Sequence, residues 1–248
     1  MEYKSERMLV VDSIITEYDI KHANTSLMRY YNLYPEKLID KIDRMKKIDR
    51  EVYVGTLQRD NKEFSKKLMQ GFDDMMELFL DTNKLSLEDD ILSIKKDAAF
   101  VVNKPVKQVD FGCVHFATKN QYKHFACIGK YEYYIRENKE VDVKGIGDRD
   151  ASNLHKDGML KFINDLIDLY IADNKKEMYE YLHDFVCAYK ARELPFDYYR
   201  EFDSQSGYRF IDKNTEIILD DIDESVIDNI DIQWNYINVI LPACRMFI

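Results

Sequence analysis

Apolar residues follow a strand-like pattern at several separate places along the chain. The apolar run from Met8 to Ile15 predicts a strand over residues 8–20. Further β-rich runs predict strands at residues 90–102, 109–117, 122–128 and 132–136. The first two of these are expected to pair around Asn103-Lys104-Pro105, and the last two to turn at Gly129-Lys130. Strands that follow one another so closely predict an antiparallel sheet.

Helical spacing of apolar residues predicts the other elements. Residues 60–80 carry an apolar stripe that predicts one long helix with a buried face. The stripe consists of Phe64, Leu68, Phe72, Met75, Met76 and Phe79. Shorter helices are expected at residues 24–33 and 35–42, with a break at Tyr53-Val54-Gly55, and two more helices between residues 158 and 191. Residues 195–248 give no clear pattern.

This order of elements predicts an α+β fold with an antiparallel sheet. Of the 248 residues, 46% are apolar and 13% aromatic, which is enough for a substantial core. No stretch is long and apolar enough to cross a membrane, and the charged N-terminal residues lack a signal-peptide pattern, so a cytoplasmic protein is expected. The four widely spaced cysteines are expected to be reduced and to form no zinc site.

The net charge of −10 argues against nonspecific nucleic-acid binding through bulk charge. The distribution is uneven, however. Bases outnumber acids in residues 41–70 and 95–144, whereas residues 216–231 contain acids and no base. A basic middle allows a local phosphate-binding groove, and a mixed solvated surface explains each stretch equally well.

Two aspartates stand at the edges of strand-like runs. Asp19 begins the string Asp19-Ile20-Lys21-His22-Ala23-Asn24, and Asp97 follows Lys95-Lys96. Two strands that bring two carboxylates together can hold the divalent ions that bind a nucleoside triphosphate. An aspartate at the end of a strand can also serve as a cap or turn residue.

In order and spacing, these motifs resemble those of the family B DNA polymerases, in particular the compact protein-primed viral branch. The resemblance covers about residues 8–190 and lacks the family's exonuclease domain. It implies an antiparallel-sheet palm over residues 1–148, with reduced helical fingers at about residues 25–88. Residues 149–248 would form a helical, thumb-like section.

The resemblance implies that Asp19 and Asp97 are catalytic and hold Mg²⁺ or Mn²⁺. In the family's third motif an Asp-Thr-Asp hairpin supplies two acids, and Lys95 stands here in place of the first of them. A cation beside a two-metal site repels the ions or replaces part of one ion's charge. Weak metal affinity is therefore expected, and it should rise when Lys95 is replaced by an acid.

The resemblance also implies nucleotide contacts. Asn24 falls where the family has the tyrosine that excludes a ribose 2′-hydroxyl, which predicts acceptance of ribonucleotides. Asn24 as an ordinary helix N-cap is the competing interpretation. Lys66, in a loose match to the second motif that ends at Gln70-Gly71, would contact the triphosphate. Arg59 and Lys62 would share the phosphate charge.

Beyond the palm, Lys130-Tyr131-Glu132-Tyr133 and Lys144-Gly145 look like the family's segments that grip the primer end. Lys130, Tyr133 and Lys144 would then contact nucleic acid. An exposed pair on an ordinary strand is the competing interpretation of Lys130 and Tyr133.

The leading functional hypothesis is a template-directed nucleotidyltransferase of viral or mobile-element origin, with nucleic acid and a nucleoside triphosphate as partners. The alternative is a palm-derived protein without catalysis that binds nucleic acid or joins a viral replication or transcription complex. Lys95 and the net acidity favour this alternative. A third hypothesis is a viral structural or interaction protein with no role on nucleic acid.

Overall fold

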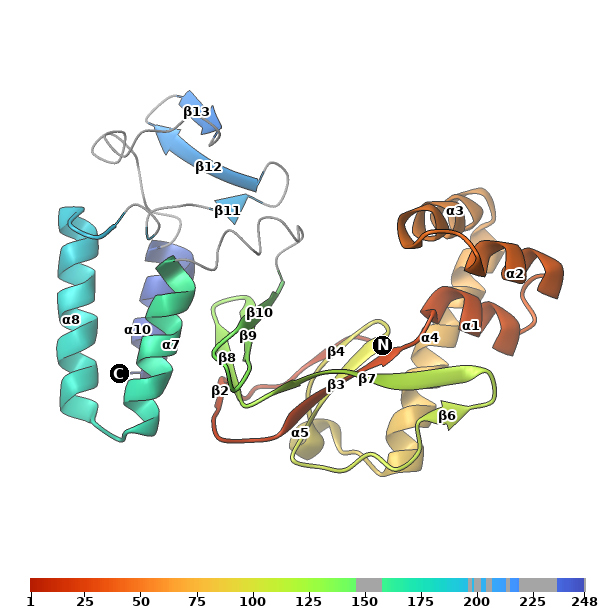
Figure 1. Cartoon of the computed structure of the whole chain (residues 1–248), viewed down its shortest axis with the longest axis horizontal. Helices are drawn as coiled ribbons and strands as arrows, with labels where there is room; N and C mark the ends of the chain where they lie inside the picture. Colours follow the sequence, from red (N-terminus) through yellow and green to blue (C-terminus); the bar gives the residue numbers. More distant parts are fainter. Residues whose placement is uncertain are drawn as a thin grey trace. The chain divides into compact units, whose positions relative to one another are not determined.

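The computed structural model describes residues 1–145, 158–195, 198, 202–203, 207–212, 215–218 and 236–247 (Figure 1). The chain forms two compact units: unit 1 is Met1–Glu6 with Ser13–Gln121, and unit 2 is Arg7–Asp12 with Tyr122–Ile248. The domain boundary expected at residues 148/149 lies outside the described residues, and the compact division comes earlier, after Gln121. The α+β class with antiparallel sheets is confirmed.

Unit 1 combines a six-stranded sheet with five helices. The strands are β1 (Tyr3–Lys4), β3 (Ile15–Ile20), β4 (Ile91–Lys95), β5 (Ala98–Val102), β6 (Asp110–Phe111) and β7 (Val114–Tyr122). The helices are α1 (Ala23–Tyr30), α2 (Glu36–Asp43), α3 (Lys47–Asp60), α4 (Lys62–Asn83) and α5 (Leu87–Asp90). All five helices lie between β3 and β4 in the chain, so the helical part is an insertion between two strands of one sheet.

The strand order of unit 1 is β1-β4-β5-β3-β7-β6. Both β3 and β4 run antiparallel to β5, which lies between them, so β3 and β4 are parallel to each other. A helical connection between parallel strands with a third strand inserted is a split β-α-β arrangement. It places the end of β3 beside the turn that joins β4 to β5.

Helix α4 covers one face of this sheet. The Phe79 ring stacks on Phe116 of β7 at 4.2 Å between centroids and lies 5.7 Å from Tyr18 of β3. The helix begins where the Asn61 side chain accepts a hydrogen bond from the Phe64 amide at 3.0 Å, and it ends at Lys84 in a left-handed conformation. The apolar stripe expected for residues 60–80 is the buried face of α4, which confirms that prediction.

Three local predictions are wrong. Residues 8–20 form two strands rather than one, because Asp12 adopts a left-handed φ of 47° and β2 (Leu9–Val10) joins a different sheet from β3. The expected break at Tyr53-Val54-Gly55 is absent, since α3 runs through it. Gly55 costs a helix about 1 kcal/mol relative to alanine, and neighbouring turns can offset that cost.

The third error concerns a hairpin. Residues 90–102 form β4 and β5 joined by a tight turn at Lys96-Asp97, where Lys96 has φ 49°. The strand expected to pair with them around residues 103–105 is β7, and it lies beside β3 instead. Lys95, Lys96 and Asp97 are consecutive charged residues that divide the apolar run, so the sequence does carry a signal for this reversal.

Unit 2 contains a four-stranded sheet of order β10-β9-β8-β2. Its strands β8 (His124–Ile128), β9 (Tyr131–Ile135) and β10 (Val141–Lys144) are antiparallel neighbours, which confirms the turn expected at Gly129-Lys130. The helices are α7 (Gly158–Ile171), α8 (Lys175–Ala191), the π-helix η4 (Tyr236–Ile240) and α10 (Leu241–Phe247). Strands β11 (Phe202–Asp203), β12 (Gly207–Asp212) and β13 (Thr215–Ile218) form a further small sheet.

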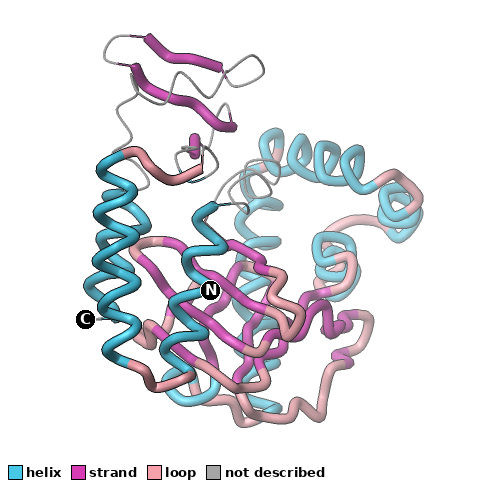
Figure 2. The backbone as a smooth tube through the Cα atoms, turned by 60° about the vertical axis from the view of Figure 1, so that its left-hand side comes forward, coloured by secondary structure: helices cyan, strands magenta, loops and turns pink. Residues whose placement is uncertain are grey.

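Helices α7 and α8 lie side by side, as Figure 2 shows. The Phe162 ring of α7 stacks on Phe185 of α8 at 4.1 Å between centroids. Their buried faces, together with η4 and α10, share one apolar core with the sheet of unit 2. The two helices expected between residues 158 and 191 are confirmed. In the described parts of the chain, no helix is long and apolar enough to cross a bilayer.

Candidate functional site

Asp19 and Asp97 line the same cavity of unit 1, which has a volume of about 460 Å³. We call it the Asp19–Asp97 cavity. Asp19 pairs with Ala98 in the register of β3 and β5, and the Ile20 amide donates to the Asp97 carbonyl at 2.9 Å. The split β-α-β arrangement therefore brings together two carboxylates that are far apart in the sequence.

The carboxylates of β3 lie on the sheet face opposite α4. Tyr18 and Ile20 belong to the apolar cluster that α4 covers. Successive side chains of a strand point to opposite faces, so Glu17 and Asp19 point away from that cluster. Glu17 is 1% exposed and accepts a hydrogen bond from the Asn120 amide at 2.7 Å.

Lys119 of β7 reaches both carboxylates of β3. Its Nζ lies 2.7 Å from Asp19 Oδ2 and 3.4 Å from Glu17 Oε1. Burial by itself would lower the pKa of Lys119, but the hydrogen bond to Asp19 and the charges of Glu17 and Asp19 outweigh burial and raise that pKa. Lys119 is therefore a fixed positive charge inside the site.

The pKa of Asp97 is raised, first because burial disfavours the charged carboxylate and second because of the nearby Asp19 charge. A cation placed between the two aspartates would relieve the repulsion and lower the pKa of Asp97.

Further cations line the Asp19–Asp97 cavity. Lys21 follows β3, and Lys47 and Arg50 come from α3. The Arg50 guanidinium lies 2.9 Å from His22 Nδ1, so His22 holds it in place. This lining combines the carboxylates of Asp19, Glu51 and Asp97 with several basic groups, which suits an anionic ligand that carries a divalent cation.

Asn24 also lines the cavity. It lies inside α1, whose N-cap is His22, so the interpretation of Asn24 as the N-cap is wrong. Its Oδ1 atom is buried without a hydrogen-bond partner among the described residues. A ligand hydroxyl or amino group could satisfy this acceptor.

The structure does not bring Arg59, Lys62 or Lys66 to this cavity. All three side chains are exposed, and Arg59 pairs with Asp60 at 3.0 Å. Lys62 and Lys66 belong to α4, which packs against the opposite face of the sheet. Lys95, paired with Ala98 in the β4–β5 register, is not among the lining residues either.

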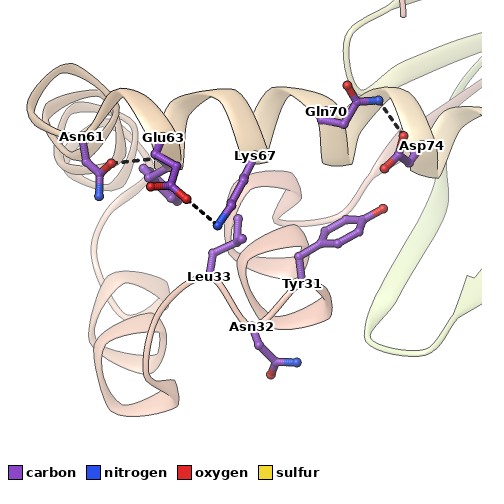
Figure 3. Close-up of a pocket in the computed structure, with 9 residues that line it drawn as sticks. Tyr31, Asn32, Leu33, Asn61, Glu63, Lys67, Gln70 and Asp74 are labelled. Carbon is purple, nitrogen blue, oxygen red and sulfur yellow. Dashed lines mark hydrogen bonds and ion pairs between the residues drawn. The ribbon is translucent and has the colours of Figure 1, made fainter.

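The second-motif segment of α4 lies at another cavity of unit 1, of about 490 Å³ (Figure 3). There Lys67 pairs with Glu63 at 2.8 Å, and the Gln70 amide donates to Asp74 at 2.7 Å. These side chains bind one another along the helix. The polar side chains of this segment therefore pair with one another, and the segment lines a different cavity from the two aspartates.

The expected primer-gripping residues belong to unit 2. Tyr133 is fully buried in its core, and Lys130 Nζ lies over the Tyr131 ring at 5.2 Å from the centroid. Lys144 pairs with Glu132 in the register of β10 and β9. Burial removes Tyr133 from contact with a ligand in this conformation, whereas the side chain of Lys130 is exposed.

Asp19 and Asp97 fit a metal only together with a substrate. Across the residues that the structure describes, no group of three or more His, Cys, Asp and Glu side chains could hold a metal ion alone. Mg²⁺ usually binds through one or two carboxylates, substrate phosphates and water rather than in a cage of protein ligands. Two aspartates supply the number of carboxylates that such a site uses, and the rest of the coordination shell would have to come from a ligand and water.

Sequence reasoning did not single out Lys119, Glu17, Lys47 or Arg50. Lys119 lies beyond the end of the strand predicted for residues 109–117, because β7 continues to Tyr122, and the register that sets it against Asp19 joins residues 100 positions apart. The charge pattern of residues 41–70 did contain a signal for Lys47 and Arg50, because bases outnumber acids there.

A family model described as the Bacteriophage PBS1 gene 130 protein matches residues 1–247. The chain belongs to this family. The match agrees with the expected viral origin, and it does not bear on the polymerase resemblance. No curated protein sequence matches the chain.

Proposed function

We propose that the Asp19–Asp97 cavity binds a nucleoside triphosphate and that this phage protein is a template-directed nucleotidyltransferase. The main support for the proposal is that Asp19 and Asp97 line one cavity, which Lys47 and Arg50 also line. The split β-α-β arrangement supports it, since polymerase palms likewise use neighbouring strands to bring two metal-binding acids together.

In the proposed reaction, a primer 3′-hydroxyl oxygen bonds to the α-phosphorus of the nucleotide. The bond from that phosphorus to the oxygen bridging to the β-phosphate breaks, pyrophosphate leaves with the electron pair, and the hydroxyl proton passes to solvent. A divalent cation held by Asp19 and Asp97 would supply charge stabilisation at the attacking and leaving oxygens. Asp19 and Asp97 would hold that cation through their carboxylate oxygens.

The basic side chains would bind the phosphates. Lys47 and Arg50 project from one helix, and Arg50 is oriented by its contact with His22. Guanidinium and ammonium groups form strong charge-assisted hydrogen bonds to phosphate oxygens. Asn24 Oδ1 would accept a hydrogen bond from a sugar hydroxyl, which favours ribonucleotides over deoxyribonucleotides.

The test is calorimetric titration of Mn²⁺ in the presence of a non-hydrolysable nucleotide analogue, followed by primer extension with labelled nucleotides. We expect metal binding that depends on the analogue, is lost in Asp19→Asn and Asp97→Asn, and is retained in Asp110→Asn. Asp110 is an exposed acid of unit 1 outside the cavity. Metal binding that survives both cavity substitutions would contradict the proposed site.

A second candidate function is nucleotide or nucleic-acid binding without catalysis, as a subunit of a viral replication or transcription complex. The 2.7 Å contact between Lys119 and Asp19 favours it, because an ammonium at this distance competes with a metal for the carboxylate. Nucleotide binding that needs no metal, together with no primer extension, would support this candidate over the enzyme.

A further inference from the structure

We propose that the Lys119 ammonium takes the place of one metal ion, so that the Asp19–Asp97 cavity holds a single divalent cation with its nucleotide. This inference rests on the proposed function, in which a divalent cation binds at Asp19 and Asp97. It assigns a role to a residue that the sequence motifs do not mark.

The main evidence for this role is the position of the Lys119 ammonium. Lys119 Nζ lies between two carboxylates of one strand, 2.7 Å from Asp19 Oδ2 and 3.4 Å from Glu17 Oε1. In a two-metal site a second ion, about 3.5–4 Å from the first, would share such carboxylates. Lys119 therefore occupies the coordination position that the second ion would need.

The surrounding contacts hold this arrangement in place. Glu17 is 1% exposed, and the Asn120 amide donates to its Oε2 at 2.7 Å. A buried carboxylate without a nearby cation is costly, so Glu17 keeps Lys119 in the site. Glu17 and Lys119 thus act as a pair, and a second ion would have to displace a buried partner.

The remaining carboxylate groups of the cavity could bind the one ion. Lys119 contacts Oδ2 of Asp19 and not its Oδ1, and Asp97 and Glu51 line the same cavity. One divalent cation between these groups relieves the repulsion that the two aspartates exert on each other. Substrate phosphates and water would complete its coordination shell.

The experiment counts Mn²⁺ ions bound to the full chain with a non-hydrolysable nucleoside triphosphate analogue, by calorimetry and by electron paramagnetic resonance. We expect one ion per chain in the wild type. Lys119→Met removes the ammonium from beside Glu17 and Asp19, so we expect a second ion and a spectrum broadened by coupling between the two ions. Lys119→Gln removes the charge but keeps a hydrogen-bond donor, and it serves the same purpose if Lys119→Met does not fold.

The matched control is Lys107→Met, which makes the same charge change at an exposed position of unit 1 outside the cavity. It should bind one ion, as the wild type does. Two ions in the wild type, or one ion in both Lys119 variants, would overturn the role of Lys119 and leave the proposed function standing. If the wild type binds no ion even with the analogue, the proposed function fails as well.

Discussion

At Asp97, burial and the charge of Asp19 both favour the protonated carboxyl, so its pKa is raised in the folded chain. A group with a raised folded pKa contributes stability below its unfolded pKa and loses that contribution as pH rises through the folded value. Ionisation of Asp97 therefore removes a stabilising contribution from the metal-free protein.

We predict that Asp97→Asn raises the melting temperature of the metal-free protein at pH 7. The neutral amide removes the repulsion from Asp19 and the burial of a charge. The gain should shrink as pH falls toward the unfolded pKa of an aspartate, near 4, because the wild-type carboxyl is then protonated too. Thermal unfolding followed by circular dichroism across this pH range is the measurement.

Asp43 serves as a control for the Asp97 prediction, because its pKa is shifted in the opposite direction. Burial would raise its pKa, but hydrogen bonds from Thr25 and Arg29 outweigh burial, and the pKa is lowered. Its stabilising contribution is therefore present at neutral pH and is lost as pH falls through the folded pKa. Asp43→Asn should lower the melting temperature at pH 7, and equal effects of the two substitutions would contradict the electrostatic explanation.

At the scale of the helices, two glycines have contrasting surroundings. Gly55 lies in α3, where an added Cβ would meet no atom within 4 Å. Gly71 lies in α4, where an added Cβ would come within 2.8 Å of the Tyr31 ring. Gly55 therefore has no packing role, whereas Gly71 lets the segment after α1 pack closely against α4.

We predict that Gly55→Ala stabilises the chain by about 0.5–1 kcal/mol, because alanine loses less backbone entropy than glycine in a helix. Gly71→Ala should destabilise it by about 1–2 kcal/mol, since overpacking of Tyr31 exceeds the same helical gain. Denaturant unfolding of the two variants checks both values. Stabilisation by Gly71→Ala would show that Tyr31 moves aside without cost.

For the protein as a whole, the net charge is negative, whereas the lining of the Asp19–Asp97 cavity includes several positive groups. The chain carries −10, which repels polyanions at long range. The Asp19–Asp97 cavity nevertheless gathers basic groups from the residue after β3, from α3 and from β7. Because salt screens distant charges beyond about 8 Å at physiological ionic strength, the local groups determine binding of a small anion.

Two charge-reversal substitutions test whether the local groups or the net charge determine anion binding. Lys47→Glu changes a cavity residue, and Lys66→Glu makes the same change in net charge on α4, outside the cavity. We predict that Lys47→Glu weakens binding of a nucleoside triphosphate about tenfold, equivalent to about 1.4 kcal/mol, whereas Lys66→Glu has little effect. Equal weakening in a fluorescence titration at physiological salt would mean that net charge, or Lys66 itself, controls binding.

The local elements could be predicted because their signals are local. The stripe of α4, the paired helices α7 and α8 and the turn at Gly129-Lys130 follow from periodicity and turn residues. The reversal at Lys96-Asp97 was missed, although the charged residues Lys95 to Asp97 divide the apolar run there. The strand predicted for residues 8–20 is interrupted at Asp12, which adopts a left-handed conformation. The pattern of apolar residues does not reveal this interruption.

Side-chain periodicity and turn residues act over a few positions, so they were enough to predict the α+β class and to place Asp19 and Asp97 at the edges of strands. Which cation contacts the two aspartates depends on long-range packing. The pairing of β3 with β7 sets Lys119 against Asp19, while α4 places Lys66 on the other side of the sheet. The register between β3 and β7 joins residues 100 positions apart and depends on how the whole unit packs. No local sequence pattern predicts such a register.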